Sequence, residues 1–206
     1  MSKVGLVCLL VCCLLTSFPA RAAEFGDIDL GIYALGSWPQ DRQIFNQGST
    51  VEASIKQGFG AGIKIALFPN FLHRMLGLEL ESNGHSSALS FPNGNNGTAR
   101  SNMLILNSMV NLIARYPGEL VRPYIGIGAG WSSSALLDPN IAGRKDNDFD
   151  TAHALAYQYI GGLQFILTQR VFAFSEYRYF SANYHWDGLA VDFRSHYGLV
   201  GVGLRF

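Results

Sequence analysis

The stretch Leu76-Gly77-Leu78-Glu79-Leu80-Glu81 places a leucine at every second position, with glycine or glutamate in between. Successive side chains of a β-strand point to opposite faces, so this alternation predicts a strand with one apolar and one charged face. No segment of the chain shows a convincing 3.6-residue stripe of an amphipathic helix. Strand is therefore the structure to expect, and the leucine face must lie against something apolar.

The period of two continues along the chain from Phe25 onward. We expect eight strands, at about residues 26–37, 57–68, 75–84, 101–115, 122–135, 153–167, 171–182 and 192–206. Most of these segments have 10 to 15 residues. That exceeds the usual strand length but suits tilted membrane strands of ~9–11 residues with extensions.

The two faces of these segments differ consistently in composition. One face is bulky and apolar, as with Phe59, Ile63 and Ile65 in the second segment and Ile125 and Ile127 in the fifth. The other face mixes glycine with amide and charged side chains. Its polar members are Lys64, Glu79, Glu81, Asn107, Asn111, Gln158, Gln164, Glu176, Arg178 and Arg205.

The overall composition decides which face turns outward. Hydrophobic residues make up 49% of the 206 residues and charged residues only 15%, with 23 glycines. A soluble sheet protein would carry charges on its exposed faces, whereas a barrel in lipid turns its apolar face outward and fills its interior with polar groups. Such a sheet must also close, because hydrocarbon offers no partner to an edge strand. The sequence thus predicts an all-β fold, an eight-stranded antiparallel up-and-down transmembrane β-barrel.

Composition also excludes other classes of protein. High hydrophobicity excludes intrinsic disorder. The 15 basic residues equal the 15 acidic ones in number, so there is no cationic excess to bind a nucleic acid. Beyond the first 20 residues no run approaches the ~18 apolar residues of a membrane helix. A soluble periplasmic ligand-binding barrel remains the alternative outside the membrane.

The first 22 residues have the features of a secretory signal peptide. A positive start at Lys3 precedes an uncharged run, and Ala20 and Ala22 fit the small-x-small cleavage rule. We therefore divide the chain into residues 1–22, cleaved, and 23–206, a single barrel domain. Cleavage would remove two basic residues and all three cysteines, leaving 13 basic against 15 acidic residues and no disulfide.

The connections between the segments alternate in length. Those at about 38–56, 85–100, 136–152 and 183–191 are long, and those at 69–74, 116–121 and 168–170 are short. Outer-membrane barrels have long extracellular loops and short periplasmic turns. We therefore predict a location in the cell outer membrane, in contact with its lipids and lipopolysaccharide, and four loops that could bind a host or surface ligand.

Two further sets of residues fit this location. Trp131, Tyr157, Tyr177 and Tyr179 are expected near the outer rim, where an aromatic girdle belongs. The alternating C-terminal residues Val202, Leu204 and Phe206 are expected to form the signal that the barrel-insertion machinery reads during biogenesis.

An inward polar face implies a charged lumen. Three cations and three carboxylates would balance there, as buried charges must if they are to stay ionised. Glu176 and Arg178 lie two apart on one strand and Arg205 lies on the next, so pairing across strands is available. We favour a structural plug, since side chains fill an eight-stranded lumen. A gated ion path or a proton relay is the alternative.

Three stretches carry a family resemblance. They are Arg122 to Gly130 (RPYIGIGAG), Phe172 to Tyr179 (FAFSEYRY), and the end of the chain from Asp192 to Phe206. The chain resembles the OmpA/OmpX-like eight-stranded outer-membrane barrels, with the porin-like surface immunogens among them. The resemblance implies the fold and the location, but members serve as anchors, adhesins, immune-evasion factors and enzymes, so it leaves the function open.

Two alternatives to a structural or surface-interaction barrel follow from this resemblance. One is an adhesin or serum-resistance factor. The other is a hydrolase like the lipid A deacylases, which use a His-x-Ser pair. At the matching position Tyr179 precedes Ser181, and tyrosine cannot serve as that base near neutral pH. His85 and Ser87 have the spacing but lie on a different strand. We therefore predict no enzymatic activity.

No cofactor and no metal are expected. The acidic stretch 146–150 is similar to the start of a calcium-binding loop, but Thr151 and Tyr157 stand where glycine and glutamate are required.

Overall fold

The computed structural model describes residues 25–40, 42–46, 49–93, 97–137, 149–186 and 189–206. The predicted signal peptide, residues 1–22, lies outside the described residues. The described chain is almost entirely strand. The strands are β1 (Gly26–Pro39), β2 (Arg42–Asn46), β3 (Ser49–Ile55), β4 (Gly58–Pro69), β5 (Leu76–Asn93), β6 (Gly97–Arg115), β7 (Val121–Leu137), β8 (Phe149–Ile166), β9 (Val171–Trp186) and β10 (Leu189–Arg205).

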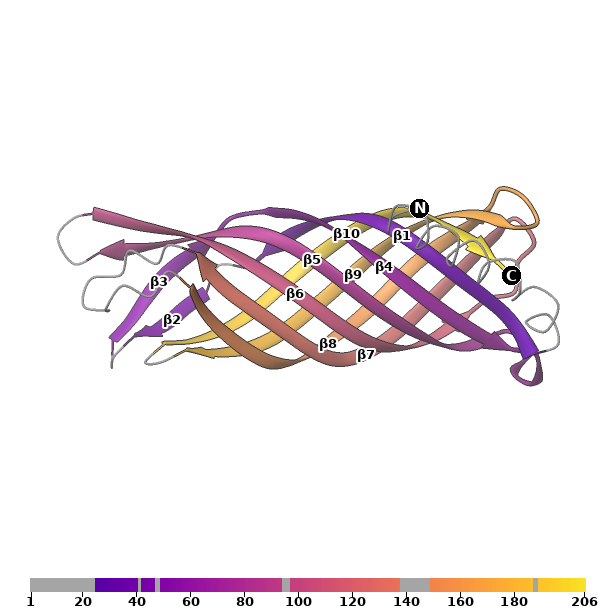
Figure 1. Ribbon diagram of the computed structural model, residues 1–206, viewed down its shortest axis with the longest axis horizontal. Coiled ribbons are helices and arrows are strands. Elements are labelled where there is room, and N and C mark those ends of the chain that lie inside the picture. Colours follow the sequence, from indigo (N-terminus) through magenta and orange to yellow (C-terminus); the bar gives the residue numbers. More distant parts are fainter. Residues whose placement is uncertain (1–24, 41, 47–48, 94–96, 138–148, 187–188) are drawn as a thin grey trace, which may run out of the picture.

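The strands close into an antiparallel barrel. Each strand from β4 to β9 pairs with the one that follows it in the sequence. β1 pairs with β4 on one side and with β10 on the other, so the barrel wall has no open edge. At the seam, Ile28 and Phe206 exchange backbone hydrogen bonds of 3.1 and 2.9 Å. The predicted closed up-and-down barrel is confirmed (Figure 1).

The ten strands occupy eight positions around the barrel, because β2 takes the position of β1 and β3 takes the position of β4. β1 ends at Pro39, which has no N–H to donate to a ladder, and β2 begins three residues later. β2 then pairs with β10 on one side and β3 with β5 on the other. The hairpin of β2 and β3 therefore extends the barrel wall beyond the ends of β1 and β4.

One prediction about the connections is confirmed and another is wrong. The short connections are turns, and the first contains a 3₁₀ helix (η1, Asn70–Leu72). The regions expected as long loops consist largely of strand: β5 and β6 extend to residues 93 and 97, β7 and β8 to 137 and 149, and β9 and β10 to 186 and 189. Figure 1 shows these extensions at the end opposite the turns and the C-terminus. Backbone pairing continues there without the apolar alternation that made the other segments recognisable.

Side-chain exposure follows the predicted parity. On β5, Leu78 and Leu80 are 57% and 55% exposed, whereas Glu79 and Glu81 between them are buried. The exposed face forms a broad apolar outer wall around the barrel, and the polar face lines the interior. Among the described residues no helix has the length and apolar character needed to cross a membrane.

Glycines on the inner face allow aromatic rings to lie flat against the wall. The ring of Tyr33 covers Gly62 on the neighbouring strand, and the ring of Tyr124 covers Gly162. A Cβ atom at either glycine would overlap the ring. The glycine-rich inner face thus makes room for the long side chains of a narrow lumen.

Candidate functional site

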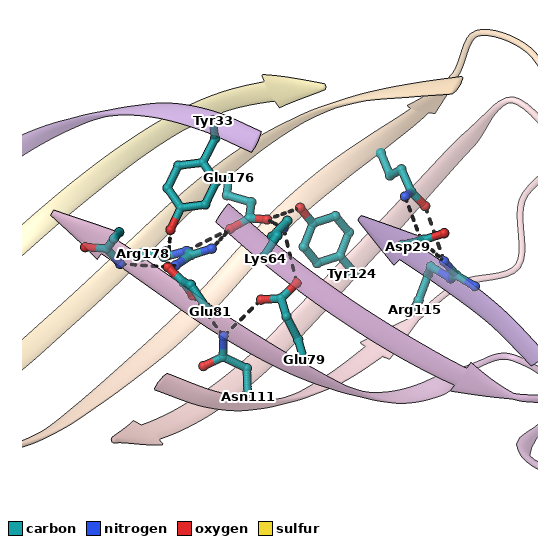
Figure 2. A network of polar contacts seen from close by, with 12 residues as sticks. Asp29, Tyr33, Lys64, Glu79, Glu81, Asn111, Arg115, Tyr124, Glu176 and Arg178 are labelled. Carbon is teal, nitrogen blue, oxygen red and sulfur yellow. Dashed lines mark hydrogen bonds and ion pairs between the residues drawn. The ribbon is translucent and has the colours of Figure 1, made fainter. Parts of the chain in front are cut away.

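The interior holds two groups of charged side chains at different levels along the barrel axis (Figure 2). We call the first the central cluster. It contains Tyr33, Lys64, Glu79, Glu81, Asn111, Tyr124, Gln158, Glu176 and Arg178. The second, nearer the short turns, is the turn-side cluster of Asp27, Asp29, Arg115, Gln164 and Arg205.

Arg178 is the centre of the central cluster. Its guanidinium is fully buried and pairs with Glu81 on β5 and with Glu176 on its own strand. Lys64 on β4 also pairs with Glu176, and its Nζ lies 3.3 Å from Glu79 Oε2. These contacts join strands on opposite sides of the lumen.

Among the described interior residues, Glu81 accepts the most hydrogen bonds. Besides Arg178, the Tyr33 hydroxyl donates to its carboxylate, and so does Asn83 at 2.8 Å. Asn111 and Gln158 donate to its other oxygen at 3.0 and 3.1 Å. A carboxylate with this many donors can stay ionised although buried.

The remaining polar groups extend the network toward the long-strand end. Asn107 donates to Asn83 at 2.9 Å, and Ser132 donates to Asn107 at 2.5 Å. The Ser132 hydroxyl also hydrogen-bonds the Tyr184 hydroxyl. On the other side of the cluster, the Tyr124 hydroxyl donates to Glu176 at 2.6 Å.

The charges of the central cluster do not cancel. Its two cations, Lys64 and Arg178, face three carboxylates. Glu176 and Glu81 are each paired with Arg178, whereas Glu79 reaches only Lys64, which Glu176 shares, and one hydrogen bond from Asn111 at 2.9 Å. Glu79 is therefore the carboxyl group with the least compensation from cations in the central cluster.

Arg115 and Arg205 hold the turn-side cluster together. Arg115 lies 2.8 Å from Asp29 and 2.9 Å from Asp27, and its guanidinium stacks 3.6 Å from the centre of the Phe68 ring. Arg205 lies 2.8 Å from Asp29. Gln164 bridges the set, since it donates to Asp29 at 3.0 Å and accepts from Arg205 at 3.0 Å.

A small cavity separates the two clusters. Its volume is about 30 Å³, and its lining includes Asp29, Lys64, Glu79, Arg115 and Tyr124. A volume of this size holds on the order of one or two water molecules. Charged groups of both clusters therefore line this cavity.

Beyond the central cluster, the interior becomes aromatic. Tyr197 is buried between Phe180, stacked at 5.3 Å, and His85, in edge contact at 5.1 Å. Phe193 packs on Phe180 at 6.1 Å. The sequence analysis did not find this aromatic layer, because it assigned the bulky residues of each segment to the outer face.

The structure does not bring the ten predicted lumen residues into one group. Eight belong to the central cluster or its extension, but Gln164 and Arg205 belong to the turn-side cluster. Arg205 does not pair with the charged residues of β9: Asp29 on β1 stands directly opposite it and binds its guanidinium. The expected balance of three cations and three carboxylates is wrong for the same reason, since Arg205 leaves the central cluster one cation short.

Sequence reasoning missed Asp27, Asp29 and Arg115. A signal for each was present. The two aspartates alternate with Ile28 and Leu30, and Arg115 continues the odd-numbered polar face of Asn107 and Asn111 on β6.

The predicted girdle residues lie on the outer wall. Trp131, Tyr157 and Tyr177 are more than half exposed, and Tyr179 lies beside them, 6.4 Å from Tyr159 between ring centres. Of the predicted insertion signal, Val202 and Leu204 face outward, and Phe206 closes the seam with Ile28.

Neither serine of the hydrolase alternative lies in a catalytic arrangement. Ser87 is buried and donates to the Lys56 carbonyl at 2.6 Å. The ring nitrogens of His85, on the same face of β5, have no hydrogen-bond partner. Ser181 points to the outer wall, and among the described residues no histidine hydrogen-bonds it. No group of three or more potential metal-binding side chains occurs in the described part of the chain.

A closed antiparallel barrel with an apolar outer wall and a polar, side-chain-lined interior defines a class, the outer-membrane β-barrels. The chain belongs to the family described as "Outer membrane protein beta-barrel domain", whose model matches residues 9–206. The protein is therefore an outer-membrane protein.

Two solved structures are similar in fold. OprG from Pseudomonas aeruginosa has a TM-score of 0.62 at 15% identity, covering 88% of this chain and 96% of that chain. Neisserial surface protein A (NspA) has a TM-score of 0.59 at 14% identity, covering 88% and 99%. Identities this low show the shared fold alone. A comparison with curated protein sequences gives no match.

Proposed function

We propose that this protein is a structural and surface-interaction barrel of the outer membrane whose lumen is plugged by its own side chains. The observation that carries the proposal is the central cluster, in which the buried Arg178 bridges Glu81 and Glu176. The cluster draws side chains from β1 and from every strand between β4 and β9. A barrel of eight strands is narrow enough for such side chains to fill it.

The turn-side cluster supports the same proposal. A conducting path would need a continuous column of water, whereas the cavity between the clusters is small and ion pairs line it on both sides. Moving Arg178 or Arg115 aside would separate buried opposite charges, at a cost of several kcal/mol.

Conductance across a planar lipid bilayer tests the plug. We expect the purified wild-type protein to give no current above the bilayer leak. We expect steady channels from the double variant Arg178→Ala/Glu81→Ala, which removes the bridge across the lumen. Leu80→Ala, an outward change on the same strand, is the matched control and should remain silent. Steady wild-type conductance would refute the plug and favour the gated ion path.

We further propose that the barrel catalyses no reaction. The support is the geometry of the two candidate serines. The Ser87 hydroxyl donates its hydrogen bond to a backbone carbonyl, and Ser181 lies on the outer face of β9. Mass spectrometry of lipid A after incubation with the protein tests this. We expect no loss of acyl chains. Deacylation that disappears in Ser87→Ala or Ser181→Ala would overturn the proposal.

The surface role rests on the strand extensions opposite the turns. We propose that these extensions and the short segments that join them stand outside the cell, where a host or surface ligand could bind. An adhesin or serum-resistance factor is the specific form of this role. Deleting residues 138–148 should abolish binding to host cells while the barrel stays heat-modifiable on gels. Unchanged binding after this deletion, and after a deletion in each of the other three connections, would argue against a surface-interaction role.

A further inference from the structure

The outer wall formed by β10, β1, β4 and β5 is hollowed. Two adjoining hollows of about 650 and 860 Å³ share Ile32, Ile63, Ser82 and Val202 among their lining residues. Together they form one groove along the lipid-facing side of the barrel, which we call the wall groove.

Small side chains make the floor of the wall groove. Ala34 pairs with Ala61 on the next strand, and Ala61 pairs with Gly84. Val200 and Leu106, at the two ends of this row, are 63% and 53% exposed and form the sides. An apolar chain lying between them can approach the backbone closely, as at small-residue contacts inside membranes.

A polar and aromatic patch adjoins the wall groove toward the long-strand end. The Trp38 ring lies over Gly36 and Gly198, one row above Ala34 and Val200. Directly opposite Trp38 on β10 stands His196. Groove and patch therefore follow one another along the same two strands, with the apolar part deeper in the membrane.

Hydrogen bonds in the patch leave one donor unused. The Gln40 amide nitrogen lies 2.8 Å from His196 Nε2, and the Tyr177 hydroxyl lies 2.6 Å from Nδ1. A neutral imidazole has one donor and one acceptor. With Gln40 donating to Nε2, Nδ1–H donates to the Tyr177 oxygen, and the Tyr177 O–H is left to donate outward.

An ion pair lies on the same outer face, beyond His196. Arg194 is on the same strand and outer face as His196, two residues further toward the long-strand end, with 38% of its side chain exposed and Asp192 at 3.0 Å. Tyr179, directly opposite His196, lies 5.5 Å from it between ring centres. An arginine, a free hydroxyl and exposed aromatic faces match a phosphorylated sugar, since arginine binds phosphate and aromatic rings sit at the interface with one apolar and one wet side.

We propose that the wall groove and this patch form one docking site for lipopolysaccharide. An acyl chain of its lipid A crosses the row at Ala34 and Ala61, between the two sides of the groove. A glucosamine phosphate receives hydrogen bonds from Tyr177 and Arg194. This assignment rests on the proposed function, because the orientation with the strand extensions outside places the patch in the outer leaflet. The order of the parts, with the polar end at the rim and the groove below, matches the order of headgroup and acyl chain in that leaflet.

Native mass spectrometry in detergent, with purified lipid A as the probe, tests the site. Tyr177→Phe should weaken lipid A binding about tenfold, the effect of losing one hydrogen bond to a charged group. Ala34→Leu, which fills the groove floor, should weaken it at least as much. The matched controls are Tyr116→Phe, near the turns, and Ala129→Leu, on the outer wall at β7. Both should bind as the wild type does.

Three results would overturn the proposal. Equal binding of lipid A and its dephosphorylated form would remove the headgroup contact. Equal binding of phosphatidylglycerol would make the site a general lipid surface. A dimer in detergent that Ala34→Leu dissociates would make the groove an interface between two copies. A conducting wild-type barrel would refute the lumen plug alone, so failure of the two proposals can be distinguished.

Discussion

Glutamine at position 81 is expected to destabilise the barrel by about 3–5 kcal/mol, the usual cost of removing one partner from a buried ion pair. The same change at position 79 is expected to cost about 1 kcal/mol or less. Glu79 and Glu81 lie two residues apart on the inner face of β5 and are buried to similar extents. The two variants are therefore matched in strand, burial and chemistry and differ only in their partners.

The difference follows from what each carboxylate accepts. Five donors converge on Glu81, and one of them is the fully buried Arg178. Glutamine would replace one acceptor oxygen with an NH₂ group that faces donors, and it would leave Arg178 with Glu176 alone. Glu79 accepts one hydrogen bond from Asn111 and shares Lys64 with Glu176, so its replacement breaks fewer contacts and leaves Lys64 paired with Glu176.

Urea unfolding of the folded protein in lipid vesicles, followed by tryptophan fluorescence, measures both free energies. Heat-modifiability on gels shows in advance that each variant folds. The double variant Glu81→Gln/Arg178→Met should recover part of the loss, because it removes a buried cation that has lost one of its two carboxylates, while Glu176 keeps Lys64. Equal losses for the two single variants, or a larger loss for Glu79→Gln, would refute the account of the interior charges.

Three further outcomes are expected. Arg115→Met should lower the unfolding free energy by about 3 kcal/mol or more in urea titration, because it breaks the turn-side cluster, whereas the partly exposed Arg122→Met should change it by about 1 kcal/mol or less. Gly62→Ala should cost about 1–3 kcal/mol by overpacking in the same measurement, while Gly161→Ala, whose added Cβ would meet nothing within 4 Å, should be near neutral. Deleting Phe206 should reduce the amount of heat-modifiable protein recovered from the outer membrane, and an unchanged yield would show that insertion does not need it.

The turns and the inner and outer faces were readable from the sequence. The outward leucines and inward glutamates of β5 lie as their alternation predicts, and the three short connections are turns at the expected positions. The strand ends beyond the lipid were not readable. Small polar residues such as Ser86 and Ser87 resemble a loop, yet their backbone pairs with β6 because that strand continues beside them.

The sequence by itself determined the class of fold, because a period of two with one apolar face has few stable solutions in lipid. Only the tertiary structure decided which inner side chains meet. Parity places Arg178 and Arg205 on the same face of neighbouring strands, but the register puts Tyr197 opposite Arg178 and Asp29 opposite Arg205. The level of each side chain in the lumen depends on the stagger of the closed barrel, which local alternation does not encode. The division into two clusters, and the small number of cationic partners of Glu79, follow from that stagger.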